Sequence, residues 1–106
     1  PCISFSFCRY KCMITHCYFY RLRNGASVED AMQELLSMKE QIPEIDSIEV
    51  GINFSTAPNA FDLVQLSKFK SYEDFKAFAE HPYHQELRDY FATVSTETAK
   101  VDFESC

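Results

Sequence analysis

The three histidines are the residues of this chain best suited to proton chemistry, and two of them, His81 and His84, flank Pro82 and Tyr83. Imidazole titrates near neutral pH, so it can accept or donate a proton under physiological conditions. His84, with His16, is therefore a candidate for proton transfer. The alternative is that these side chains only pack and form local hydrogen bonds.

Metal binding is a second chemistry open to histidine, because three imidazoles can hold a metal ion. Here Pro82 interrupts the turn between His81 and His84, and no carboxylate has a definite place beside them. No glycine-rich nucleotide-binding motif is present either. We therefore expect no metal and no cofactor.

The cysteines give no clear motif. Four of the five crowd into the first 17 residues, and their spacings lack the C-x₂-C pairs of zinc sites. An odd number of cysteines clustered at one end is also unlike a disulfide framework. Met13 resembles a natural start, so we predict that residues 1–12 are an extension added by cloning or gene annotation and that one domain spans 13–106.

Charge is unevenly distributed and limits the choice of partners. Residues 1–23 carry four basic and no acidic side chains, whereas residues 24–106 carry six basic and sixteen acidic ones, for a formal net charge of −6. Phosphate contacts need clustered Lys and Arg, so we expect no nucleic-acid partner.

No apolar run is long enough to span a bilayer, and the start lacks a signal-peptide pattern. We expect no membrane partner and a cytoplasmic location.

Periodicity predicts the elements that must position the histidines. Strands are expected over residues 13–22, 45–54, 61–69 and around 100–104. Helices are expected to begin at Ser27 and Ser71, each followed three residues later by an aspartate as in a capping box. Pro43 ends the first helix, and Pro82 breaks the second before a further helical piece over 82–93.

The order β-α-β-β-α-β suits a split β-α-β arrangement with a four-stranded antiparallel sheet and both helices on one face, an α+β fold. The strands at 13–22 and 61–69 are apolar on both faces. An uncovered apolar sheet face is too large a patch for a monomer to expose. A second copy packed sheet to sheet is the simplest cover, so we predict a homodimer.

Aromatic residues are predicted to line a cavity between sheet and helices, where a small apolar or aromatic molecule would bind. The alternative is that they simply fill the core. Together with His81, the predicted ligand-binding residues are Tyr18, Tyr20, Phe61, Phe75, Phe78 and Tyr90.

From residue 13 to 104 the chain resembles the stress-responsive α/β-barrel (Dabb) family of the dimeric α/β-barrel superfamily. The resemblance implies a ferredoxin-like protomer and a homodimer whose two sheets form a barrel. It assigns no single reaction, and some plant members are linked to stress tolerance. The matching segments are Ile14-Thr15-His16, Ile42-Pro43-Glu44-Ile45, Glu49-Val50-Gly51-Ile52-Asn53, Phe61-Asp62-Leu63-Val64, Phe78-Ala79-Glu80-His81-Pro82-Tyr83-His84 and Val101-Asp102-Phe103.

Some relatives in this family cyclise polyketides with a Tyr–His pair, and the resemblance places the general base of that pair at His84. His16 also matches a histidine of those members. The tyrosine position is Phe78 here, and a further histidine position is Leu63, so half of the polar site is missing. Three functions are therefore carried forward: a homodimeric binding protein without an assigned reaction, a cyclase- or lyase-like enzyme using His84, and a purely structural stress protein.

Overall fold

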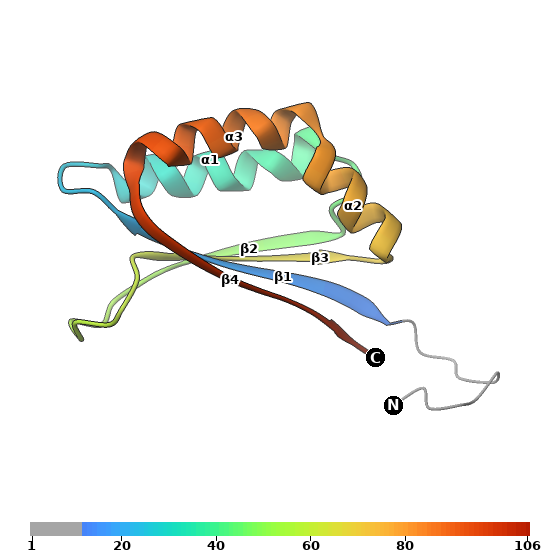
Figure 1. The fold of residues 1–106 in the computed structure, drawn as a ribbon, viewed down its shortest axis with the longest axis horizontal. Coiled ribbons are helices and arrows are strands. Elements are labelled where there is room, and N and C mark those ends of the chain that lie inside the picture. The colour runs from blue at the N-terminus through green and yellow to red at the C-terminus, as the bar shows by residue number, and fades with distance from the viewer. Residues whose placement is uncertain (1–11) are drawn as a thin grey trace.

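A computed structural model describes residues 12–106 and shows a four-stranded antiparallel sheet covered on one face by three helices (Figure 1). The elements follow the order β1 (Met13–Leu22), α1 (Val28–Gln41), β2 (Ser47–Ile52), β3 (Leu63–Phe69), α2 (Tyr72–Glu80), α3 (Pro82–Val94) and β4 (Ser95–Ser105). The strand order in the sheet is β2-β3-β1-β4. The predicted α+β fold with a split β-α-β arrangement is confirmed.

The helices begin and end where the sequence indicates. Ser27 Oγ accepts a hydrogen bond from the Asp30 amide, and Ser71 Oγ accepts one from the Asp74 amide. These contacts satisfy backbone donors that have no partner within the first turn. His81 ends α2 and caps α3, where its Nδ1 accepts a hydrogen bond from the Tyr83 amide.

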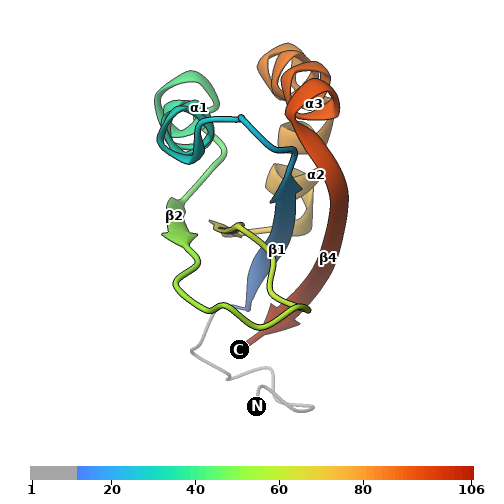
Figure 2. The ribbon, with the colours of Figure 1, turned by 90° about the vertical axis from the view of Figure 1, so that its left-hand side faces the viewer.

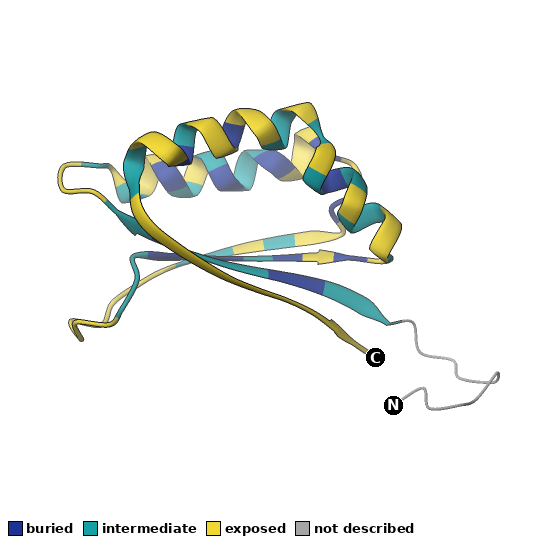
Figure 3. Cartoon of the chain, viewed as in Figure 1, coloured by how far each residue is buried: buried dark blue, intermediate teal, exposed yellow. Residues whose placement is uncertain are grey.

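The core lies between the inner face of the sheet, which faces the helices, and the helices themselves. Seen from the end, α1 lies above β2, while α3 lies on the side of β4 (Figure 2). Buried residues lie on the side of the helices that faces the sheet and along the central strands β1 and β3 (Figure 3). The most deeply buried apolar side chains are Ala31, Leu35, Met38, Ile42, Ile45, Leu63, Phe69 and Phe78.

Three strands have boundaries that differ from the predictions: β2 spans Ser47–Ile52 instead of 45–54, β3 begins at Leu63 instead of 61, and β4 begins earlier than expected. β2 ends at Ile52, so Phe54 lies in the following loop and is 99% exposed instead of continuing the alternation. β4 begins at Ser95, well before the predicted 100, although its first residues are polar. Backbone pairing with β1 along almost its whole length defines β4, and such pairing leaves no apolar pattern in the sequence.

The outer face of the sheet, which faces away from the helices, is largely apolar. Register brings Cys17 opposite both Leu66 and Val101, and Phe19 opposite Val64. On β4 the apolar residues Val101 and Phe103 occupy this outer face and are 57% and 47% exposed. The two-faced character predicted for β1 and β3 is therefore present, and β4 extends it.

Cys12 and Cys106 form a disulfide that joins the start of β1 to the end of β4. The cysteines were expected not to form a disulfide framework; this one pair bonds because antiparallel pairing of β1 and β4 brings the two ends of the described chain together. Cys17 is a free thiol. Cys2 and Cys8 lie outside the described residues.

None of the helices described in residues 12–106 is long and apolar enough to cross a membrane.

Candidate functional site

A cavity of about 550 Å³ lies between the inner face of the sheet and the helices. Its buried end is formed by side chains of the core, among them Leu35 and Phe91. Its exposed lining residues come from α3, where Arg88 and Ala92 contribute, and from β4, where Thr98 and Lys100 contribute. The cavity therefore opens to solvent between α3 and the edge strand β4.

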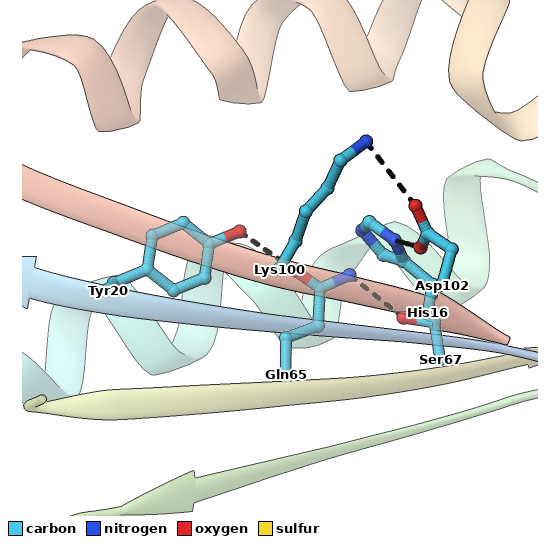
Figure 4. A network of polar contacts seen from close by, with 6 residues as sticks. All are labelled: His16, Tyr20, Gln65, Ser67, Lys100 and Asp102. Carbon is cyan, nitrogen blue, oxygen red and sulfur yellow. Dashed lines mark hydrogen bonds and ion pairs between the residues drawn. The ribbon is translucent and has the colours of Figure 1, made fainter.

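His16 projects from β1 into this cavity and is held by Asp102 on the neighbouring strand (Figure 4). The His16 Nδ1 to Asp102 Oδ1 distance is 2.5 Å, and Lys100 Nζ lies 3.3 Å from the other carboxylate oxygen. A carboxylate can only accept, so Nδ1 carries the proton and Nε2 keeps a free lone pair when the ring is neutral. Burial lowers the pKa of His16, although Asp102 opposes this shift. At pH 7 the ring is therefore a neutral base.

His84 also lines the cavity, from the first turn of α3. Its Nδ1 lies 3.1 Å from the Ala79 carbonyl oxygen, which can only accept, so Nδ1 donates and Nε2 again carries the free lone pair. The ring packs against Phe78, with 4.4 Å between ring centroids. Burial lowers the pKa of His84, the Ala79 hydrogen bond opposes this, and His16, Arg88 and His81 lower it further.

A buried chain of hydrogen bonds forms part of the floor. The Tyr20 hydroxyl donates to Gln65 Oε1 over 2.9 Å, and Gln65 Nε2 donates to Ser67 Oγ over 2.8 Å (Figure 4). Gln65 is only 1% exposed, so each of these bonds satisfies a polar group that has no access to water. Burial also raises the pKa of Tyr20, which therefore stays a neutral donor.

Aromatic rings form one wall beside the two histidines. Tyr18, Phe75 and Phe78 each lie within 6 Å of the His16 ring, measured between centroids, and all three line the cavity. Four of the predicted ligand-binding residues, Tyr18, Tyr20, Phe75 and Phe78, are thus gathered with both predicted catalytic histidines.

The other three predicted ligand-binding residues do not line this cavity. Phe61 precedes β3, packs against Phe19 and lies beneath the Arg21 guanidinium. The imidazole of His81 is engaged as the cap of α3. Tyr90 packs edge-on against Phe91. Burial raises the pKa of Tyr90, and the carboxylates of Glu34 and Asp30 on α1 raise it further. Helical periodicity alone did not distinguish the cavity side of α3 from the side toward α1.

Four functional candidates were not singled out from the sequence: Asp102, Gln65, Arg88 and Lys100. Asp102 and Gln65 take their roles from neighbours distant in sequence, since 86 positions separate His16 from Asp102 and 45 separate Tyr20 from Gln65. The strict alternation of Lys100, Val101, Asp102 and Phe103 was the available signal. It places Lys100 and Asp102 on one face of β4, and the register with His16 makes that the inner face. Within residues 12–106 no cluster of three or more His, Cys, Asp or Glu side chains could hold a metal ion.

The fold and the cavity together define a ferredoxin-like α+β protein with a pocket between its two layers. The sequence matches the stress responsive A/B barrel domain, Dabb, over residues 14–105, and the chain belongs to this family. Its biochemical activity is unassigned. No curated protein sequence matches the chain.

Solved structures agree with this fold. A dimeric ferredoxin-like protein of unknown function from Thermobifida fusca is 21% identical, with 89% of this chain and 92% of that chain covered and a TM-score of 0.77. A dimeric ferredoxin-like protein of unknown function from Bacteroides fragilis is 29% identical, covering 88% and 96% of the two chains with a TM-score of 0.66. A hydroxynitrile lyase from Passiflora edulis is 17% identical, covering 89% and 94% with a TM-score of 0.79.

Proposed function

We propose that this Dabb protein binds a small molecule with an apolar or aromatic body in the cavity between sheet and helices. The observation that carries the proposal is the lining: aromatic side chains form one wall, and His16 and His84 each keep a free Nε2 lone pair. Ligand pockets typically combine a predominantly apolar lining with a few polar groups that orient the ligand. A volume of about 550 Å³ is also within the usual range of such pockets.

A neutral two-ring probe, 2-naphthamide, tests this binding by NMR titration of the ¹⁵N-labelled protein. We expect saturable shifts of amides in α2, α3 and β4 that surround the cavity. Ala92→Trp fills the mouth, so it should weaken binding at least tenfold. Gln85→Trp is the matched control, because Gln85 is also exposed on α3 but does not line the cavity. Equal binding to both variants would refute the proposed location.

Acid–base catalysis is the second candidate, and it is favoured by the two neutral imidazoles of one cavity. Each has Nδ1 committed as a donor, so each presents Nε2 as the proton acceptor. His84 would take the proton, and His16, oriented by Asp102, would assist. The Passiflora edulis relative is named as a lyase, at 17% identity.

The probe 5-nitrobenzisoxazole tests for a general base without knowledge of the substrate. A base removes the proton on carbon, the N–O bond breaks, and a nitrile and a phenolate form. We expect turnover above that of free imidazole, and a loss of about a hundredfold in His84→Gln. Lys76→Gln should leave the rate unchanged, because Lys76 is an exposed residue of α2 that does not line the cavity. A wild-type rate equal to that of free imidazole would refute this function.

We also propose that the protein is a homodimer joined through the outer face of the sheet. Phe19, Val64, Val101 and Phe103 make this face apolar in the described residues, and a two-fold pairing of identical faces would cover them. The Thermobifida fusca and Bacteroides fragilis relatives are described as dimeric. Light scattering at micromolar concentration should give twice the 12.3 kDa chain mass, and a monomer mass would refute the proposal.

A cytoplasmic location remains a proposal that the Cys12–Cys106 disulfide opposes, since disulfides persist mainly in oxidising compartments. Fractionation of cells under thiol-blocking conditions, followed by non-reducing mass analysis of the chain, tests location and disulfide together. We expect a cytoplasmic protein to carry this pair reduced. An oxidised pair in a secretory fraction would overturn the cytoplasmic assignment.

A further inference from the structure

Arg88 is a cation of the cavity wall that has neither an acidic partner nor a hydrogen bond within residues 12–106. The other charged lining residues are already paired. Glu97 Oε1 lies 2.9 Å from Arg21 Nε, and Lys100 Nζ lies 3.3 Å from Asp102 Oδ2. The uncompensated charge of this cavity is therefore positive, although the chain as a whole has a formal net charge of −6.

The fold directs Arg88 to the same place as His84. The two residues are four positions apart on α3, a spacing that puts both side chains on one face of a helix, and both line the cavity. Lys100 rises from β4 toward the helix layer (Figure 4). The mouth between α3 and β4 thus has a cationic group on each rim, with the aromatic wall of Tyr18, Phe75 and Phe78 within the same cavity.

We propose that the ligand is an aromatic monocarboxylate, with its carboxylate bound by Arg88 at the mouth and its ring against the aromatic wall; this rests on the proposed binding function. A planar guanidinium matches a carboxylate with two parallel hydrogen bonds. One unpaired cation balances one negative charge, which favours a carboxylate over a phosphate dianion. Lys100 contributes less, because Asp102 already holds its ammonium group.

A pair of isosteric probes, 2-naphthoate and 2-naphthamide, separates the charge from the shape of the ligand. Both are titrated by NMR at pH 8, where the carboxylate is ionised and the lowered pKa values of His16 and His84 keep both rings neutral. We expect the wild-type protein to bind naphthoate about tenfold more tightly than the amide. Arg88→Gln should bring the two dissociation constants within a factor of two of each other by weakening naphthoate alone.

Lys76→Gln is the matched control, since it removes one cation from an exposed helical position that does not line the cavity. It should keep the tenfold preference. Equal affinity of the wild-type protein for both probes would overturn the carboxylate proposal and leave the binding function intact. A preference for naphthoate over the amide that survives Arg88→Gln would also overturn the carboxylate proposal. Failure of both probes to bind would instead overturn the binding function and this inference with it.

Discussion

The buried His16 should make the stability of the fold depend on pH in a defined direction. Burial lowers the pKa of His16 below the ordinary histidine value of 6.5, and only 6% of the residue is exposed. Between the folded pKa and 6.5 the unfolded chain therefore binds more protons than the folded one. The free energy of unfolding falls as the pH drops through this window.

The size of the effect follows from one proton. Where His16 is protonated only in the unfolded chain, the slope approaches about 1.4 kcal/mol per pH unit. The pKa of His84 is lowered in the same direction, mainly by burial, but this side chain is more exposed, so solvent screening makes its contribution smaller. The stability provided by the neutral rings should be complete above pH 6.5.

Urea unfolding at fixed protein concentration, from pH 5.5 to 7.5, measures this slope. His16→Gln retains a donor for Asp102 and lacks the titrating ring, so it should lose most of the slope. His84→Gln should lose a smaller part. The interval lies above the usual titration range of carboxylates, which limits their contribution. A His16→Gln variant with the wild-type slope, or a wild-type protein that gains stability on acidification, would refute the reasoning.

Three further outcomes are expected. Tyr20→Phe leaves Gln65 Oε1 buried without its donor, so it should cost about 1–3 kcal/mol in urea unfolding, and a neutral result would contradict the role of this hydrogen bond. Phe103→Asp places a charge on the outer face of the sheet, so light scattering should report a monomer; an unchanged dimer would move the interface elsewhere. Cys106→Ser opens the bond to Cys12 across a sequence separation of 94, so the unfolded chain gains entropy and stability should fall by about 2–4 kcal/mol without reductant; no change would mean that the pair is not oxidised in solution.

Much of the fold could be predicted because its signals are local. Ser27 and Ser71 cap helices through amides three residues away. Pro82 is the first residue of α3, and α2 ends just before it. β4 was predicted only in part, because an edge strand with polar residues depends on pairing with β1. Phe54 was assigned to β2 because its hydrophobicity continued the alternation, but the strand ends at Ile52.

The candidate site was predicted where a residue type carries chemistry by itself. His16 and His84 were identified from imidazole chemistry and family resemblance, and both line the cavity. Asp102 and Gln65 were missed, since a carboxylate or an amide becomes part of a site only through its neighbours. Those neighbours are set by strand register, and the two members of each hydrogen-bonded pair lie 86 and 45 positions apart in the sequence.

The sequence by itself determined the α+β class, the capped helices, the apolar strands and the histidines, because propensity, capping and periodicity act over a few residues. Only the tertiary structure decided which polar side chains meet. The antiparallel register of β1 and β4 puts Asp102 beside His16 and Cys12 beside Cys106. The packing of α3 over the sheet turns His84 and Arg88 toward the cavity, while Tyr90 lies outside it. Contacts of this kind depend on the positions of whole elements, which no local pattern encodes.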